Sequence, residues 1–205
     1  MTTRLQNAYE FSVILKVVDA PPLINHYALD AHFVVVTDNY ELQNLAFQRV
    51  SYYVESILNG AVFVDQADTE TIKQFQNLQF RVVQFPTVPV DQIVNMMLFS
   101  KLNAIMEDQL VVTDLALCSD LCGGVRYLHA DEDDLGIFAH DGWWSESDPT
   151  YYKKEAKRAK NVLKIESKVS QAWREFGLAW PEQTDAKATN VLSMPNTKKN
   201  NPEEW

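Results

Sequence analysis

Glycine and cysteine are scarce in this chain, which has six Gly and two Cys among 205 residues. The glycines form neither a phosphate-binding loop of the G-x-x-x-x-G-K-[ST] type nor a dinucleotide fingerprint, and neither G-x-S-x-G nor H-E-x-x-H occurs. These absences argue against the familiar nucleotide-binding, serine-hydrolase and zinc-peptidase chemistries. Cys118 and Cys122 are too close in sequence to join distant elements, so we expect reduced thiols rather than a disulfide framework.

Long apolar runs are also missing. No window approaches the roughly 20 apolar residues of a membrane-spanning helix, and the N-terminal residues lack the apolar run of a signal peptide. Hydrophobic residues nevertheless make up 46% of the chain, which is enough for an ordinary core. The sequence therefore predicts a folded cytoplasmic protein without membrane contact.

Basic residues are too few to balance the acidic ones, and the net charge is −10. An acidic body repels polyanions, so the sequence disfavours binding to nucleic acid or to anionic membranes. The imbalance is sharpest in residues 127–152, which hold seven Asp or Glu residues and no Lys or Arg. Residues 153–205 have the opposite balance, with eleven basic and seven acidic side chains.

The chain does contain a regular alternation of β-branched runs and helical periodicity. The apolar runs predict strands at 11–18, 31–37, 61–65, 80–85 and 110–118. Helical spacing predicts helices at 39–58, 68–77 and 89–107. From the second strand onward, this order is typical of a ferredoxin-like split βαβ unit. The predicted fold is therefore α+β, with an antiparallel sheet and two long helices on one face.

Two local signals set boundaries within this pattern. Asp38, followed three residues later by Glu41, makes a capping box that predicts the start of a helix. Pro21 and Pro22 favour extended backbone and predict a loop over residues 19–30.

The chain is expected to divide into three parts. An α+β domain is predicted over 1–147, a long amphipathic helix over 148–180 and a flexible polar tail over 181–205. Within the domain, the core is predicted to span 9–118 and an acidic loop insertion to span 118–147.

Two features predict binding to another protein. The long helix would expose an apolar stripe to water unless another surface covers it, and adjacent tryptophans in a loop cannot both enter one core easily. The residues predicted to bind a partner are Trp143, Trp144, Val162, Ile165, Val169, Trp173 and Phe176. We therefore expect a homo-oligomer or a complex with another protein.

The segment 118–144 gathers residue types that hold metal ions. A zinc site could use Cys118, Cys122, His129 and His140, although the histidines are eleven positions apart and break the usual spacing. The acidic run after His129 matches a calcium-binding loop at its first, third and sixth positions and lacks the ligands at the fifth and twelfth. A looser divalent site would use His129, Asp131, Asp133, Asp134, His140 and Asp141. A solvated acidic turn is the competing interpretation, and no other cofactor is predicted.

Cys122 is also a candidate nucleophile. Gly123 and Gly124 follow it and could leave backbone N–H groups free for an oxyanion. The base would be His129 or His140. The surrounding carboxylates are expected to raise the pKa of the thiol, which disfavours this chemistry.

The function favoured by these observations is a non-catalytic module that self-associates or binds a protein. The alternative is a small metal-dependent or Cys-dependent hydrolase with its site in residues 118–141. The residues do not decide whether the protein is an enzyme.

Overall fold

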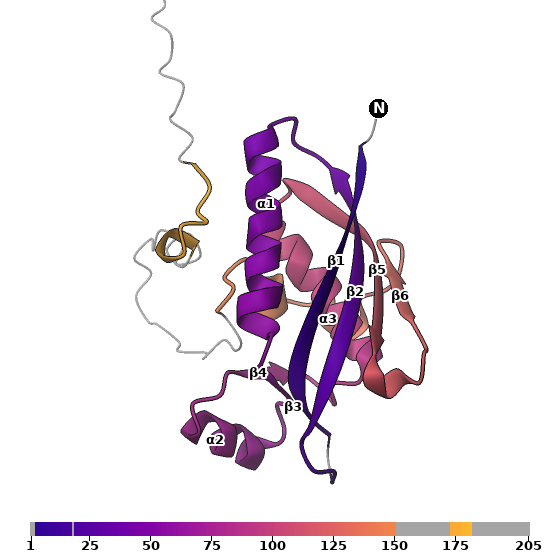
Figure 1. Ribbon diagram of the computed structural model, residues 1–205, viewed down its shortest axis with the longest axis vertical. Helices are drawn as coiled ribbons and strands as arrows, with labels where there is room; N and C mark the ends of the chain where they lie inside the picture. Colours follow the sequence, from indigo (N-terminus) through magenta and orange to yellow (C-terminus); the bar gives the residue numbers. More distant parts are fainter. Residues whose placement is uncertain (1–2, 18, 151–172, 182–205) are drawn as a thin grey trace, which may run out of the picture.

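The computed structural model describes residues 3–17, 19–150 and 173–181. The strands are β1 (Arg4–Lys16), β2 (Leu23–Val35), β3 (Val62–Asp65), β4 (Val82–Phe85), β5 (Leu110–Ser119) and β6 (Tyr127–Ala130). The helices are α1 (Tyr40–Tyr52), α2 (Thr69–Asn77), α3 (Asp91–Met106) and a π-helical segment, Tyr53–Leu58, that continues α1. Short 3₁₀ turns lie at Asp120–Cys122, Gly136–Phe138 and Trp143–Ser145. Together these elements form a mixed α/β fold (Figure 1).

β1 and β2 form a long antiparallel hairpin at the centre of the sheet, with twelve paired residues in each strand. Side chains alternate between the two faces, so that the odd-numbered residues from Tyr9 to Leu15 are buried and their neighbours are not. The prediction of a loop over residues 19–30 is wrong, because β2 already begins at Leu23. A half-buried strand has no continuous apolar run, so a search for such runs misses its first half.

The strand order is β4-β3-β1-β2-β5-β6. β3 runs parallel to both β1 and β4, whereas the remaining pairs are antiparallel. This mixed sheet contradicts the predicted ferredoxin-like antiparallel sheet. The reason is that α2 returns the chain across the sheet between β3 and β4, so that β4 enters in the same direction as β3.

The predicted acidic loop insertion, residues 118–147, also differs from the structure. It contains β6, which pairs with β5 and forms one edge of the sheet. Phe138 and Trp143, from its 3₁₀ turns, belong to the main hydrophobic core. The segment is therefore an integral part of the fold.

The two faces of the sheet are covered unequally. α1 and α3 contact each other and enclose the main core on the inner face. α2 covers the opposite face only at the β3–β4 end, where Ile72 packs on Val62, Val64 and Val82. In the described part of the chain, no helix covers the remainder of that outer face. We call this surface of β1, β2, β5 and β6 the open face.

Asn39, rather than the predicted Asp38, caps α1. Its Oδ1 accepts the backbone N–H groups of Glu41 (2.9 Å) and Leu42 (3.4 Å). We expect Asn39→Ala to lower the free energy of unfolding by about 1 kcal/mol, because these N–H groups lose their acceptor. The matched change Asp38→Ala should stay within about 0.5 kcal/mol of the unmodified protein in urea denaturation. Equal effects of the two substitutions would contradict this assignment.

Most of the predicted long helix and tail falls outside the described residues. So do the predicted partner-binding residues Val162, Ile165 and Val169. Of the range 148–180, the structure describes 148–150 and 173–180. The division of the chain into a domain, a helix and a tail therefore stays a prediction. Within the described segments, no helix has the length and apolar character needed to span a membrane.

Candidate functional site

The open face consists of the residues that alternate with buried ones along its four strands. Its centre carries small side chains, which belong to Ala8, Ala28, Ala116 and Cys118. Two large apolar side chains lie on the same face: Ile24 on β2 is 67% exposed and Leu128 on β6 is 74% exposed. The open face therefore combines small side chains at its centre with exposed large apolar side chains beside them. This combination makes it a candidate surface for contact with another molecule.

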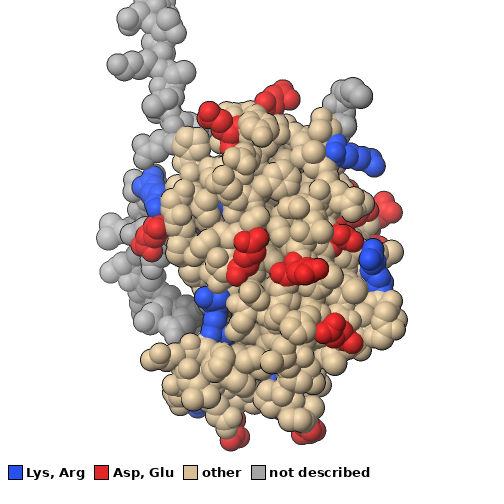
Figure 2. Space-filling model, viewed as in Figure 1, with Lys and Arg blue, Asp and Glu red and all other residues tan. Residues whose placement is uncertain are grey.

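Charged side chains on the open face are few, and Arg4 and Lys16 lie at the two ends of β1, on the same side as Ala8 and Glu10. Glu10, Asp30 and Asp114 point outward from β1, β2 and β5. Arg126 lies 3.3 Å from the Asp30 carboxylate, in an exposed ion pair. Figure 2 views this side of the molecule and shows a largely uncharged surface over the hairpin, with separate carboxylates on it. A partner that binds here would therefore meet apolar and small groups, with carboxylates along the middle of the strands and basic side chains at the ends of β1.

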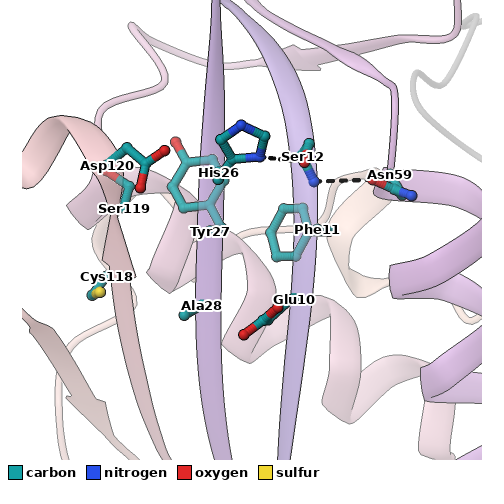
Figure 3. A pocket seen from close by; sticks show the side chains of 10 residues that line it. All are labelled: Glu10, Phe11, Ser12, His26, Tyr27, Ala28, Asn59, Cys118, Ser119 and Asp120. Carbon is teal, nitrogen blue, oxygen red and sulfur yellow. Dashed lines mark hydrogen bonds between the residues drawn. The ribbon is translucent and has the colours of Figure 1, made fainter.

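A pocket of about 520 Å³ lies on the open face, between the hairpin and the end of β5 (Figure 3). The hydroxyl of Ser12 shares a hydrogen bond with Nδ1 of His26 (2.5 Å) across the β1–β2 pair. The backbone N–H of Ser12 donates to Oδ1 of Asn59 (3.0 Å). A serine–histidine contact is part of a nucleophilic arrangement. Among the described residues, however, no carboxylate is hydrogen-bonded to His26 to orient its ring.

Cys118 lines this pocket at the end of β5, and Cys122 follows in the 3₁₀ turn Asp120–Cys122. The backbone N–H of Ser119 donates to Sγ of Cys122 (3.2 Å). This bond, with one from the backbone of Gly124, lowers the pKa of the Cys122 thiol. Partial burial raises the pKa of Cys118, and the neighbouring Cys122 thiol raises it further. The expected rise for Cys122 is wrong because the N–H groups are hydrogen-bonded to its sulfur and outweigh the more distant carboxylates.

The other predicted metal ligands do not converge on this pocket. His129 is buried on the inner face of β6, where its ring lies 4.6 Å from that of Phe99. The remaining predicted metal ligands are exposed, and they are Asp131, Asp133, Asp134, His140 and Asp141. Throughout the described ranges, no group of three or more His, Cys, Asp or Glu side chains is placed to hold a metal ion. Divalent metal binding therefore stays a prediction.

His129 lines a second pocket, of about 290 Å³, together with Asn95 and Asp133. Burial lowers the pKa of the imidazole, and the Asp133 carboxylate opposes this effect. Nε2 of His129 and Oδ1 of Asn95 are buried without a hydrogen-bond partner among the described residues. These two atoms could accept hydrogen bonds from water or from a small polar molecule.

The adjacent tryptophans make hydrogen bonds within the chain. Trp143 is 5% exposed, and its indole N–H donates to the carbonyl oxygen of Gln84 (3.0 Å). The indole N–H of Trp144 donates to the carbonyl oxygen of Phe138 (3.0 Å). Their predicted role at a partner surface stays untested, and both indoles already have partners inside the fold.

Lys101 holds the loop that carries these tryptophans. Its side chain is fully buried, and Nζ donates to the carbonyl oxygens of Trp143 (3.0 Å) and Asp148 (2.8 Å). A third, shorter bond reaches the carbonyl oxygen of Glu146. Burial lowers the pKa of Lys101 to about 7, while the carboxylates of Asp148 and Glu146 oppose this shift.

The described C-terminal segment, residues 173–181, packs around Arg49 of α1. The Arg49 guanidinium carbon lies 4.7 Å from the Trp173 ring centroid and 3.7 Å from that of Trp180. Its Nη1 pairs with a carboxylate oxygen of Glu107 at 2.9 Å. These contacts attach the segment to the domain through a buried cation and two aromatic rings.

Two predicted partner-binding residues lie in this segment. Trp173 is fully buried, and its indole N–H donates to the carbonyl oxygen of Ser147 (2.9 Å). The Phe176 ring lies 4.7 Å from the ring of Tyr52 on α1. In the described structure, both side chains pack against their own chain, and their role in binding a partner stays untested.

The burial of Lys101 and Arg49 was not predicted from the sequence, although the spacing of each residue within its helix indicates it. Lys101 is midway between Met97 and Ile105 and therefore lies on the apolar side of α3. Arg49 lies four positions before Tyr53, within the apolar stripe of α1. A basic residue inside an apolar helical stripe is a signal for a buried, fully hydrogen-bonded cation.

The fold and site define a mixed α/β protein with one open sheet face. No protein-family model matches the chain, and no curated protein sequence matches it. Among solved structures, an uncharacterized protein from Wolinella succinogenes is similar, with 12% sequence identity and a TM-score of 0.47. The match covers 64% of this chain and 99% of that protein.

Proposed function

We propose that this protein is a non-catalytic module that binds another protein through the open face of its sheet. The observation that carries the proposal is the pair of exposed side chains, Ile24 at 67% and Leu128 at 74%, on a face that no described helix covers. Burial of apolar surface stabilises a complex by about 25 cal/mol per Å² before the entropic costs of association. The small side chains at the centre of the face allow a partner to approach the strands closely.

The charges of the open face favour a partner different from the chain itself. Glu10, Asp30 and Asp114 lie nearer the middle of the face than Arg4 and Lys16, and they would face like charges if two copies packed centre to centre, which is unfavourable. A protein with an apolar centre and Lys or Arg residues around it would pair with these carboxylates. We therefore propose a protein partner whose contact surface has Lys or Arg residues around an apolar centre. A second copy of the chain is the alternative occupant of the open face.

The pocket chemistry supports binding over catalysis. The Ser12–His26 pair has no orienting carboxylate bonded to His26 among the described residues, and the candidate nucleophile Cys122 does not line the pocket, nor do His129 and His140. A cytoplasmic location belongs to the same proposal, because the two cysteines are free thiols, as expected in a reducing compartment.

The test compares open-face variants with a matched control. Ala28→Arg adds bulk and charge at the centre of the face, and Leu128→Asp removes its most exposed apolar group. Leu78→Asp is the control, because Leu78 is 67% exposed after α2, outside the open face. We expect both open-face variants to weaken capture of the partner by roughly tenfold or more, which equals about 1.4 kcal/mol, and the control to leave it unchanged.

Direct contact is checked with a photo-reactive amino acid at position 128 or position 78. Cross-links from position 128 to one basic partner surface are expected, and position 78 should give none. Equal behaviour of all three variants would contradict the proposal. A dimer in sedimentation velocity that Ala28→Arg dissociates would identify a second copy as the occupant and overturn the choice of a different protein.

A further inference from the structure

We infer that the pocket between α3 and β6 is a binding site for a small guanidinium cation. This pocket has a volume of about 290 Å³, and its polar lining includes Asn95 from α3, His129 from β6 and the carboxylates of Asp133 and Asp134. The inference does not depend on the proposed protein-binding function, because none of these four side chains belongs to the open face.

Two polar side chains that line the pocket are buried, and each has an atom without a partner. Asn95 is 1% exposed and His129 is 6% exposed. The side-chain N–H of Asn95 donates to the carbonyl oxygen of Tyr127 (3.1 Å), so the amide is held by β6. Among the described residues, neither Oδ1 of Asn95 nor Nε2 of His129 has a hydrogen-bond partner. A buried polar atom left unpaired costs free energy, and a ligand that supplies the missing partners removes this cost.

The missing partners are hydrogen-bond donors. The amide oxygen of Asn95 can only accept a hydrogen bond. The His129 ring packs 4.6 Å from that of Phe99, and burial lowers the pKa of the imidazole, which keeps it neutral above pH 7. A neutral imidazole with its proton on Nδ1 accepts at Nε2. A ligand with several N–H groups can therefore pair with both atoms.

The charge of the pocket selects a cation among such donors. One oxygen of Asp133 accepts the backbone N–H of Ala130 (2.8 Å), and one oxygen of Asp134 accepts that of Gly136 (2.9 Å). The other oxygen of each carboxylate has no hydrogen-bond partner in the described part of the chain. No Lys or Arg is among the described residues that line the pocket. The positive end of the α3 dipole is close by, and Asp91 in the first turn of the helix opposes it.

A guanidinium group fits this set of acceptors better than an ammonium group. Its N–H groups point outward in one plane, so they can reach acceptors on several sides of a pocket, and it is more weakly hydrated than an ammonium. At about 30 Å³ for each water molecule, the pocket has room for roughly ten waters, which is enough for a guanidinium group and a short chain attached to it. The group can belong to a free small molecule or to an arginine side chain of a protein.

The experiment follows the imidazole nitrogens of the full-length protein by NMR at pH 7.5 and constant ionic strength. We expect millimolar methylguanidinium to move the Nε2 signal of His129 in a saturable way and to leave the signals of the exposed His140 in place. Methylammonium should bind more weakly, and tetramethylammonium and acetate should give no change, since neither has an N–H group. No change at Nε2 of His129 with methylguanidinium, or an equal response to tetramethylammonium or acetate, would overturn the inference.

Variants test the site by calorimetric titration with methylguanidinium. Asp133→Asn removes a charge and keeps an oxygen for the Ala130 N–H, and we expect it to weaken binding by roughly fivefold or more. Asp131→Asn is the matched control, because it makes the same charge change in the same turn outside the pocket lining, and it should stay within about twofold. His129→Phe keeps a ring beside Phe99 and removes Nε2, so binding should be lost. Equal losses in Asp131→Asn and Asp133→Asn would show general charge attraction in place of a site.

A second probe identifies the source of the guanidinium group. N-acetylarginine methylamide carries the same group on a peptide unit. Binding tighter than that of methylguanidinium would indicate an arginine side chain of a protein, and equal or weaker binding would indicate a free small cation. Both results support the site only if Asp133→Asn and His129→Phe weaken them. Binding of either probe that neither variant changes would overturn the inference.

Discussion

Arg49→Met is expected to lower the free energy of unfolding by roughly 1.5–3 kcal/mol, the usual contribution of hydrogen bonds to a charged group, because the carbonyl oxygens of Leu178 and Ile105 lose their donor. The substitution leaves the Glu107 carboxylate without its guanidinium partner at 2.9 Å. It also removes the donor, Nε, that binds the carbonyl oxygen of Leu178 (2.7 Å) and the cation between the Trp173 and Trp180 rings. The measurement is urea denaturation followed by far-ultraviolet circular dichroism.

The same substitution should loosen the attachment of residues 173–181 to α1. Limited proteolysis is expected to cleave this segment at least several-fold faster in Arg49→Met than in the unmodified protein. Arg49→Lys should be intermediate, because an ammonium keeps the charge and loses the planar, forked geometry. The control is Lys73→Met, which removes an exposed positive charge on α2. A stability of Arg49→Met within about 0.5 kcal/mol of the control would contradict this prediction.

Lys101→Met is expected to have the second large effect, at roughly 1–3 kcal/mol near pH 7, because a buried acceptor left unpaired costs about that much. Three carbonyl oxygens, of Trp143, Glu146 and Asp148, lose their common donor. Removal of the desolvated ammonium offsets part of this cost. Hydrogen exchange of residues 143–148 should accelerate in the variant, since Lys101 joins this loop to α3.

The pH dependence follows from the lowered pKa of Lys101. Its folded-state pKa of about 7 lies below its ordinary value of 10.5, so between these values the unfolded chain binds more protons than the folded one. The stability contributed by this group therefore rises with pH above 7, by at most about 1.4 kcal/mol per pH unit. It is fully present only above the unfolded pKa, and it falls as the pH drops toward 7.

The test is the difference in unfolding free energy between the unmodified protein and Lys101→Met, measured from pH 7 to 9.5. We expect this difference to grow with pH, because the variant has no titrating group at position 101. Lys73→Met is again the control for the loss of one positive charge. The upper limit avoids the tyrosine range, where burial raises the pKa of Tyr9. A difference that does not change with pH would show that Lys101 titrates alike in the folded and unfolded states.

Local pattern determined much of the secondary structure. The helix predicted at 89–107 is α3, Asp91–Met106, and the strand predicted at 110–118 is β5, Leu110–Ser119. Both have strong apolar periodicity, which depends only on near neighbours in the sequence. β6 was not predicted, because Tyr127–Ala130 contains no β-branched residue, unlike the equally short β3 and β4.

Strand order and direction were decided by tertiary structure. β1 lies between β2 and β3, and the pairing of Ile14 with Val62 joins residues that are distant in sequence. Periodicity reports which residues share a face and carries no information about which strand lies beside which. The predicted antiparallel sheet failed at this step, because the α2 crossover makes β3 and β4 parallel.

The chemistry of the candidate site was also determined partly by the sequence and partly by the tertiary structure. Sequence alone identified Cys118 and Cys122 as a close pair and recognised that the glycines after them could leave backbone N–H groups free. The direction of the Cys122 pKa shift was determined by the structure of the turn. Backbone hydrogen bonds to the sulfur lower the pKa and outweigh the carboxylates that are near it in the sequence. The partners of Lys101 and Arg49 likewise come from loops far along the chain. A buried cation is stable only where tertiary structure supplies its acceptors, and no local pattern encodes their positions.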